Sequence, residues 1–158
     1  MDEASPRAGT GSCRTIGAMT TVLSDRLRAF LADKHFLTLA TVDPDGAPHQ
    51  AVIWYLVDGD ELIVNSAVGR RWPTNLVRDG RISGAITDHR DGYRWMGLTG
   101  TAISVTDQPT AQAHIAAMAR YYHDEDADKA ERLIATRFER QKRISFRIRV
   151  DVILDNLD

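Results

Sequence analysis

Two adjacent arginines stand where a strand-like segment of the chain gives way to a helix-like one. In VNSAVGRRWPTNLVRDGRIS, residues 64–83, an apolar strand ends in small residues and is followed by Arg70 and Arg71. The first N–H groups of a helix lack backbone partners and carry partial positive charge, so a phosphate can approach them past Ser66 and Ala67. Guanidinium groups add charge-assisted hydrogen bonds. The stretch therefore predicts an anion site, and phosphate fits it well.

A simpler interpretation of the same two arginines requires no ligand. Arginines are common on solvated turns, where they form ion pairs of little energetic value. Asp79 and Glu61 are near enough in sequence to serve as partners for Arg70 and Arg71. The local sequence is compatible with both interpretations, so the surrounding elements have to be considered.

Most of the elements that would position these arginines are predicted to be strands. Ser24 can cap a first helix, in which Leu23, Leu27, Phe30 and Leu31 recur at helical spacing. Turn signals at 43–46 and 58–60 separate three strands, which should form an antiparallel meander. The expected strands are 36–42, 48–57, 61–66, 81–88, 93–106 and 144–154, and the expected helices are a short one after Arg71 and longer ones over 109–122 and 126–142.

This order of elements predicts an α+β protein built on a small antiparallel barrel of six strands with flanking helices. Gly97 and Gly100 are expected at bends or bulges that help the barrel to close. Residues 1–20 are rich in small and polar residues, which predicts a disordered extension before a single domain over 21–158.

Composition excludes several classes of function. The net charge is −2, from 20 basic and 22 acidic side chains that are interleaved, so we expect neither nucleic acid nor a membrane as partner. One cysteine, Cys13, gives no disulfide or zinc cluster, and no signal-like apolar run is present, which favours the cytoplasm. The five histidines are scattered and predict no metal site. The sequence also lacks hydrolase, metallopeptidase, dinucleotide-loop and phosphate-loop motifs.

Three segments together resemble one known superfamily. LATVDPDGAPH, GRRWPTNLVRDGRIS and YRWMGLTGTA occur in the order typical of the pyridoxamine 5'-phosphate oxidase-like split β-barrels. The chain is most similar to the flavin and deazaflavin oxidoreductases of that superfamily, which commonly use coenzyme F420. The resemblance covers residues 24–154. It implies a homodimer that binds two cofactors in grooves between the subunits.

The resemblance also assigns roles to individual residues. The cofactor phosphate is expected near Ser66, Ala67, Arg70, Arg71 and Asn75, and Trp72 is also assigned to the cofactor site. The ring system is expected on the strand formed by Gln50, Ala51, Val52, Ile53 and Trp54, with Tyr93 and Trp95 of the partner subunit closing the groove. A strand rich in branched and aromatic side chains suits a flat tricyclic ring. Plain core or interface packing is the alternative role for Trp54 and Trp95.

Two departures from the family pattern bear on the cofactor and the reaction. Many relatives that use deazaflavin have a lysine where this chain has Trp72, followed here by Pro73, so one phosphate-binding cation is missing and FMN remains an alternative to F420. Arg137, Arg140 and Arg143 are candidates to contact the acidic tail of a polyglutamylated cofactor. The C-terminal signature of true pyridoxamine phosphate oxidases is absent, so vitamin B6 oxidation is not expected.

The resemblance implies an oxidoreductase that transfers a hydride between reduced F420 and an unsaturated or quinone-like small molecule. Such a reaction needs no nucleophile, because the cofactor carries the hydride and the protein positions the substrate. Tyr93, His49 or bulk water could supply the proton. The alternatives are an FMN-binding oxidoreductase of the same fold and a non-catalytic binder of flavin, deazaflavin or haem.

Overall fold

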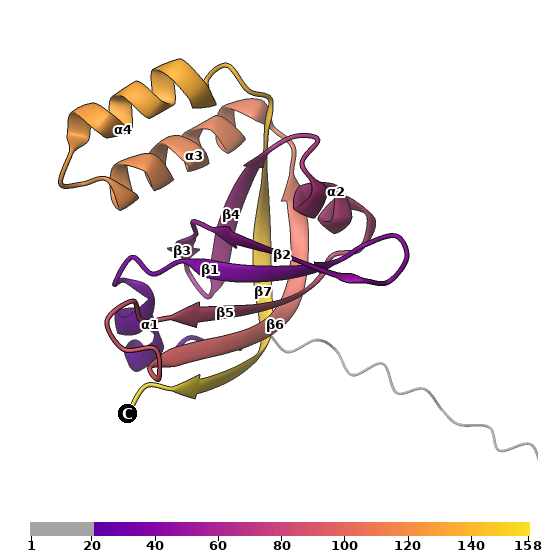
Figure 1. The fold of residues 1–158 in the computed structure, drawn as a ribbon, viewed down its shortest axis with the longest axis vertical. Helices are drawn as coiled ribbons and strands as arrows, with labels where there is room; N and C mark the ends of the chain where they lie inside the picture. The colour runs from indigo at the N-terminus through magenta and orange to yellow at the C-terminus, as the bar shows by residue number, and fades with distance from the viewer. Residues whose placement is uncertain (1–20) are drawn as a thin grey trace, which may run out of the picture.

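Seven strands and four α-helices form the fold of residues 21–158, the part of the chain that the computed structural model describes (Figure 1). The extension expected over 1–20 lies outside the described residues. The strands are β1 (Leu37–Val42), β2 (Pro48–Ile53), β3 (Leu56–Asp58), β4 (Glu61–Ala67), β5 (Arg81–Thr87), β6 (Trp95–Val105) and β7 (Arg143–Asn156). The helices are α1 (Asp25–Leu31), α2 (Arg71–Arg78), α3 (Gln108–Tyr122) and α4 (Ala127–Leu133), the last continued by a π-helical turn over Ile134–Phe138.

The strands form one antiparallel sheet whose two edges are consecutive in sequence. The strand order is β2-β1-β5-β6-β7-β4-β3, and no hydrogen-bonded pairing joins β2 to β3 among the described residues. Only Trp54 and Tyr55 separate these edge strands, and three residue steps span at most roughly 11 Å. The sheet must therefore curl until its edges nearly meet, which makes a barrel that is split at this point. The expected α+β class and antiparallel barrel are confirmed.

The strand count differs from the six expected because the segment 48–57 is not continuous. It divides into β2, which pairs with β1, and β3, which pairs with β4, so the expected meander is interrupted in its middle strand. At the break, the Tyr55 N–H donates to the Tyr122 hydroxyl at 3.3 Å, and the Tyr55 carbonyl lies at the same distance from it. A side chain of α3 thus replaces the neighbouring strand as the hydrogen-bonding partner of Tyr55.

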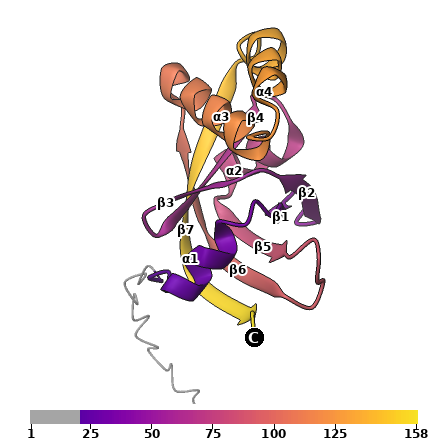
Figure 2. The same ribbon diagram turned by 90° about the vertical axis from the view of Figure 1, so that its left-hand side faces the viewer.

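Two hydrophobic clusters flank the sheet. The larger fills the barrel and includes α1 and α2, whereas the smaller joins β4 to α3, α4 and the π turn. Ser24 caps α1 as predicted, accepting a hydrogen bond from the Leu27 N–H at 3.3 Å. Figure 2 shows α3 and α4 side by side at one end of the molecule, with α1 toward the other. None of the helices described in 21–158 has the length and apolar character needed to cross a membrane.

One helix ends earlier than predicted, and only one of two glycines in β6 lies at an irregularity of the sheet. The helix expected over 126–142 ends at Phe138, because its last turn widens into π geometry before the chain turns into β7. Gly100 lies at a register shift between β6 and β7, as predicted, and an added Cβ there would lie 2.3 Å from the Arg149 carbonyl oxygen. The register of β6 with its neighbours is regular at Gly97, so no bulge occurs there.

A buried carboxylate attaches α2 to the turn between β1 and β2. Arg71 donates from two nitrogens to the two oxygens of Asp43, and Asn75 donates to Asp43 at 2.8 Å and to Thr41 at 3.1 Å. The hydrogen bonds from Arg71 and then from Asn75 hold the pKa of Asp43 below its ordinary value. The ionised carboxylate therefore stabilises this junction.

We expect Tyr55→Phe to lower the free energy of unfolding by about 1–2 kcal/mol, because the fully buried Tyr55 hydroxyl donates to the Leu31 carbonyl at 3.0 Å. The matched control is Tyr121→Phe, which removes an exposed bond of the same kind to Ala32 and should change stability by less than about 0.5 kcal/mol. Urea denaturation measures both values. Equal effects of the two changes would contradict the importance of the Tyr55 contact.

The Asp43 junction predicts a pH-dependent stability. A carboxyl whose pKa is depressed in the folded state contributes stability above its unfolded pKa and loses it as the pH falls through the folded value. Asp43→Asn should therefore lower the melting temperature at neutral pH, and the difference from wild type should shrink to nothing in strong acid. Thermal unfolding across this range tests the prediction, with the exposed Glu139→Gln as control. A difference that persists in acid would contradict it.

Candidate functional site

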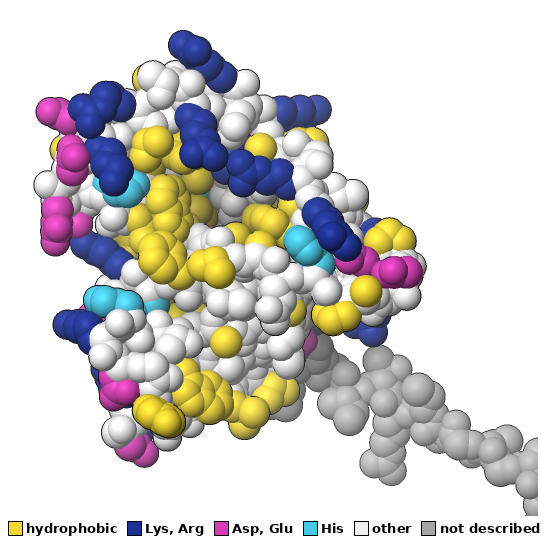
Figure 3. All heavy atoms as spheres, in the orientation of Figure 1, with side chains coloured by type: hydrophobic (Ala, Val, Ile, Leu, Met, Phe, Trp, Pro, Cys, Tyr) yellow, Lys and Arg dark blue, Asp and Glu magenta, His cyan; other side chains and the backbone are white. Residues whose placement is uncertain are grey.

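A cavity of about 290 Å³ opens where the sheet, α2 and α3 meet. Figure 3 shows hydrophobic side chains gathered around this hollow, with basic side chains along one edge. β2 and its continuation form one wall, the small cluster under α3 forms the second, and the start of α2 forms the third. The lining residues are Phe36, Val52, Ile53, Trp54, Asn65, Arg70, Trp72, Ile115, Met118, Arg137, Phe138 and Arg143.

Aromatic stacking fixes the apolar wall. The Trp54 ring is stacked on Tyr122, with centroids 5.2 Å apart and an interplanar angle of 8°, and it meets Phe138 edge to face. Val52 lies on the outward face of β2 and is 68% exposed, so its side chain faces the cavity rather than the barrel core. Trp54 thus packs against its aromatic neighbours and also lines the cavity, where the wall offers a flat apolar surface to a ligand.

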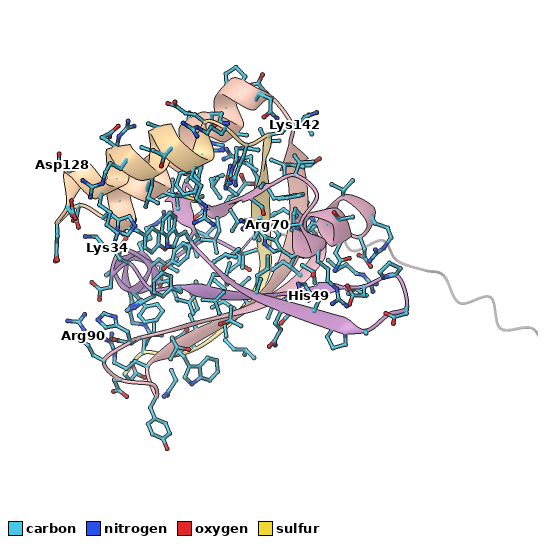
Figure 4. All side chains as sticks on the ribbon, turned by 45° about the horizontal axis from the view of Figure 1, so that its top comes forward. Lys34, His49, Arg70, Arg90, Asp128 and Lys142 are labelled. Carbon is cyan, nitrogen blue, oxygen red and sulfur yellow. The ribbon has the colours of Figure 1, made fainter. Side chains whose placement is uncertain are left out.

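Three arginines from separate elements converge on this cavity. Arg70 precedes the first turn of α2, Arg137 lies in the π turn and Arg143 begins β7. Figure 4 labels Arg70, which lies between α2 and the α3–α4 pair. Within residues 21–158, none of the three forms an ion pair with a carboxylate. Burial, and then the charges of Arg70 and Arg137, lower the pKa of Arg143 to about 10.

Neutral oxygens hold the Arg143 guanidinium in place. It is 3% exposed and donates to Asn65 Oδ1 at 2.9 and 2.6 Å and to Gln141 Oε1 at 2.6 Å. Asn65 is fixed in turn, because its amide donates to the Ala111 carbonyl and to Ser145, both at 2.8 Å. A guanidinium has about five N–H donors, so two remain for a ligand. Two N–H groups of Arg143 are therefore available to an anion.

The structure separates the two arginines that look alike in sequence. Arg70 lines the cavity and has no carboxylate partner among the residues that the structure describes, whereas Arg71 is paired with Asp43 and lines a neighbouring open depression together with Asn75. The interpretation that pairs them with Asp79 or Glu61 is wrong, because those carboxylates bind Arg81 and Arg147. The first turn of α2 has no acidic residue and no side-chain cap. Because Pro73 has no N–H and the Thr74 N–H donates to the Arg70 carbonyl, the Arg71 and Trp72 N–H groups are the ones available to an anion.

The other residues expected around the cofactor lie at different distances from the cavity. Trp72 lines it and also packs against Phe146 in the barrel core. Gln50 is exposed on β2, and Ala51 packs against the core. Ser66 and Ala67 lie in β4 and do not line this cavity, although the buried Ser66 hydroxyl has no hydrogen-bonding partner among the described residues.

Tyr93 and Trp95 lie in and after the turn between β5 and β6, and neither lines the cavity. Tyr93 is 84% exposed, and Trp95 begins β6 opposite Asn156 at the end of β7. Their expected role is to close the groove from a second copy of the chain, which a single chain does not test. That role stays a prediction.

Several cavity residues had no signal in the sequence. Asn65 reads as a polar residue in a strand, and Phe36, Ile115 and Met118 read as core residues. Phe138 faces the cavity because the π turn alters the helical spacing, and π turns are frequent at functional sites. Arg137 and Arg143 are the two cavity residues anticipated through their possible contact with an acidic cofactor tail.

The arrangement suits a ligand with a flat apolar body and several negative charges. Stacked aromatic and branched side chains would contact the body, and the three arginines would bind the charged groups. Phosphate and carboxylate both form strong charge-assisted bonds with guanidinium. The residues present therefore fit a flavin or deazaflavin carrying anionic substituents.

Comparison with known proteins agrees with this chemistry. A curated relative, the F420H(2)-dependent biliverdin reductase of Mycobacterium tuberculosis, is 33% identical over 90 residues, which span 56% of this chain and 64% of that protein. The match thus covers less than two thirds of the relative. A solved F420 reductase has a similar fold, with a TM-score of 0.64, 23% identity and coverage of 80% of this chain and 94% of that one.

The same fold occurs in a protein with a different role. The haem storage protein HutZ of Vibrio cholerae aligns with a TM-score of 0.65 and 18% identity, covering 85% of this chain and 95% of that one. At such identities the likeness concerns the fold alone. The family model for pyridoxamine 5'-phosphate oxidase, however, matches residues 23–150, which is most of the chain. The antiparallel split barrel and this match lead to one conclusion: the chain belongs to the pyridoxamine 5'-phosphate oxidase family.

Proposed function

We propose that the chain is an F420-dependent oxidoreductase that transfers a hydride between the reduced cofactor and an unsaturated or quinone-like small molecule. One observation carries this proposal: Arg70, Arg137 and Arg143 converge on a cavity with an aromatic wall. None of these arginines has a carboxylate partner within residues 21–158. The relative that reduces biliverdin in an F420H(2)-dependent manner supports both the cofactor and an unsaturated acceptor.

The number of arginines favours F420 over FMN. FMN has one phosphate and no acidic tail, and a bidentate guanidinium together with helix N–H groups can satisfy it. Three guanidinium groups in one cavity match a phosphate followed by carboxylates, as in a polyglutamylated cofactor. Arg137 and Arg143 also replace the cation that is missing at Trp72. FMN remains the alternative cofactor of the same fold.

The chain's own residues would bind, orient and shield the reacting groups. When bound, reduced F420 supplies the hydride. Val52, Ile53 and Trp54 would hold the ring against the edge of the sheet, while Ile115 and Met118 limit access of water from the α3 side. Positioning of this kind is what the reaction requires of the protein.

The residues that line the cavity indicate which groups can donate a proton to the reduced substrate. Among the lining residues there is no carboxylic acid, histidine, tyrosine or cysteine. His49 and Tyr93, the side chains considered from the sequence, both lie outside this lining. We therefore propose that water protonates the reduced substrate.

A homodimer would complete the site. The cavity is slightly smaller than the roughly 300–1,000 Å³ that enclose most ligands of drug size, so one chain surrounds only part of a cofactor. Exposed apolar side chains on β6 and β7, namely Ile103, Val152 and Leu154, offer a surface for a second copy. This agrees with the side-by-side barrels that the resemblance implies.

Arg70→Ala should weaken F420 binding by about 5- to 150-fold, the equivalent of about 1–3 kcal/mol for a lost charge-assisted contact. Arg71→Ala is the matched control, because Arg71 is already paired with Asp43 and its loss should lower the melting temperature more than the affinity. Ring fluorescence during titration measures binding, and circular dichroism verifies folding. Equal losses of affinity in both variants would contradict the separation of roles.

The cofactor itself is tested by titrating the wild-type protein with F420, FMN and haem in parallel. We expect F420 to bind most tightly and its affinity to fall as salt is added, since arginine–anion contacts are screened. Stronger binding of FMN would favour the flavin alternative. Preferential binding of haem without turnover of any reduced deazaflavin would instead support a storage role, which the lack of a histidine in the cavity lining disfavours.

A further inference from the structure

A buried histidine, His35, directly precedes Phe36, which lines the cavity. His35 is 1% exposed, and neither its Nδ1 nor its Nε2 has a hydrogen-bonding partner among the described residues. Leaving one buried polar atom unpaired costs about 1–3 kcal/mol. A partner that binds a ring nitrogen of His35 would remove this cost.

Strand pairing brings two potential ligands to His35. In the antiparallel register of β1 and β5, Leu37 is paired with Ile86, so continuing the register by two residues sets His35 opposite Asp88. His89 follows directly. The ligand atoms of His35, Asp88 and His89 all lie within 4.8 Å of one another. No metal site was expected because the histidines are scattered in the sequence. The fold nevertheless brings His35 and His89 together with Asp88.

The Asp88 carboxylate is held in a fixed orientation. It is 4% exposed, Oδ1 accepts from the Arg90 N–H at 2.8 Å, and Oδ2 accepts from the Arg94 guanidinium at 2.9 Å. Each carboxylate oxygen has about two lone pairs, so both retain capacity for a metal ion. Outer contacts of this type orient metal ligands in known sites. Arg90, labelled in Figure 4, lies at the α1 end of the molecule, where it also approaches Asp33 at 3.8 Å.

We propose that His35, Asp88 and His89 form a binding site for a divalent transition-metal ion of the zinc type. Two imidazoles and one carboxylate suit zinc, cobalt or ferrous iron, whereas magnesium and calcium prefer oxygen ligands alone. In a tetrahedral zinc site with bonds of about 2.0–2.2 Å, neighbouring ligand atoms lie about 3.3–3.6 Å apart, so ligand atoms that are now within 4.8 Å of one another need to approach by at most about 1.5 Å. The exposed His89 is free to make this movement.

The bound ion would connect the segment before β1 to the turn after β5. This connection bears on the cavity, because Phe36 lines it and the Tyr122 hydroxyl donates to the His35 carbonyl at 2.8 Å. Because His89 is exposed, water would fill the remaining coordination positions. The ion is therefore assigned a structural role, separate from hydride transfer.

The test is a titration of chelator-treated full-length protein with Co²⁺ and then Zn²⁺. We expect visible absorption bands from one bound Co²⁺ per chain, loss of these bands as Zn²⁺ displaces it, and a higher melting temperature with either ion. His89→Ala should weaken Co²⁺ binding by at least about 100-fold, since even outer-shell changes cost about 10- to 100-fold. Because His89 is exposed, this variant should fold normally.

Two further variants keep the test decisive. His49→Ala removes a histidine on β2 outside the proposed site and should bind Co²⁺ as the wild type does. His35→Asn should lose binding, with circular dichroism verifying its fold. Absence of both the absorption bands and the thermal shift in the wild type would overturn the proposal, as would wild-type affinity in His89→Ala.

Discussion

The site depends on the Arg143 guanidinium, which is buried without a carboxylate partner in the described part of the chain, residues 21–158. Removing a charge from water is costly, and the amide oxygens of Asn65 and Gln141 offset only part of that cost for Arg143. Arg70 and Arg137 add like charge nearby, which disfavours the protonated form further. A bound anion would relieve both penalties. The cavity therefore suits an anionic ligand, and its three arginines come from the start of α2, the π turn and the start of β7.

Much of the fold could be predicted from local sequence patterns. The main error of that prediction arises from a contact between segments that are distant in sequence. Alternating residues and the turns at 43–46 and 58–60 gave the hairpins, and Ser24 marked the start of α1. The break at Tyr55 left no such signal. It arises because the Tyr122 hydroxyl, 67 residues away, takes the place of a neighbouring strand. Side-chain to backbone contacts between distant segments are invisible to periodicity, so one strand was expected where two occur.

The candidate site could be predicted only in part, for a related reason. Val52, Trp54 and Arg70 follow from the resemblance and from the strand-to-helix turn, and the structure brings them to one cavity. Arg143 and Asn65 meet there because β4 pairs with β7, with Asn65 opposite Ser145. Nothing in the sequence distinguishes Arg71 from Arg70. The difference lies in the position of Asp43, which the hairpin carries beneath α2.

Tyr122 links the cavity to the proposed metal site by direct contact. Its ring is stacked with both Trp54 and Phe36, and its hydroxyl bonds to the backbone of His35 and Tyr55. Any ion that fixes His35 would therefore also fix a wall of the cavity and the junction at which the barrel is split. No long pathway is needed, since one side chain touches all three features. The aromatic wall, the broken strand and the His35 backbone thus share one contact residue, Tyr122 of α3.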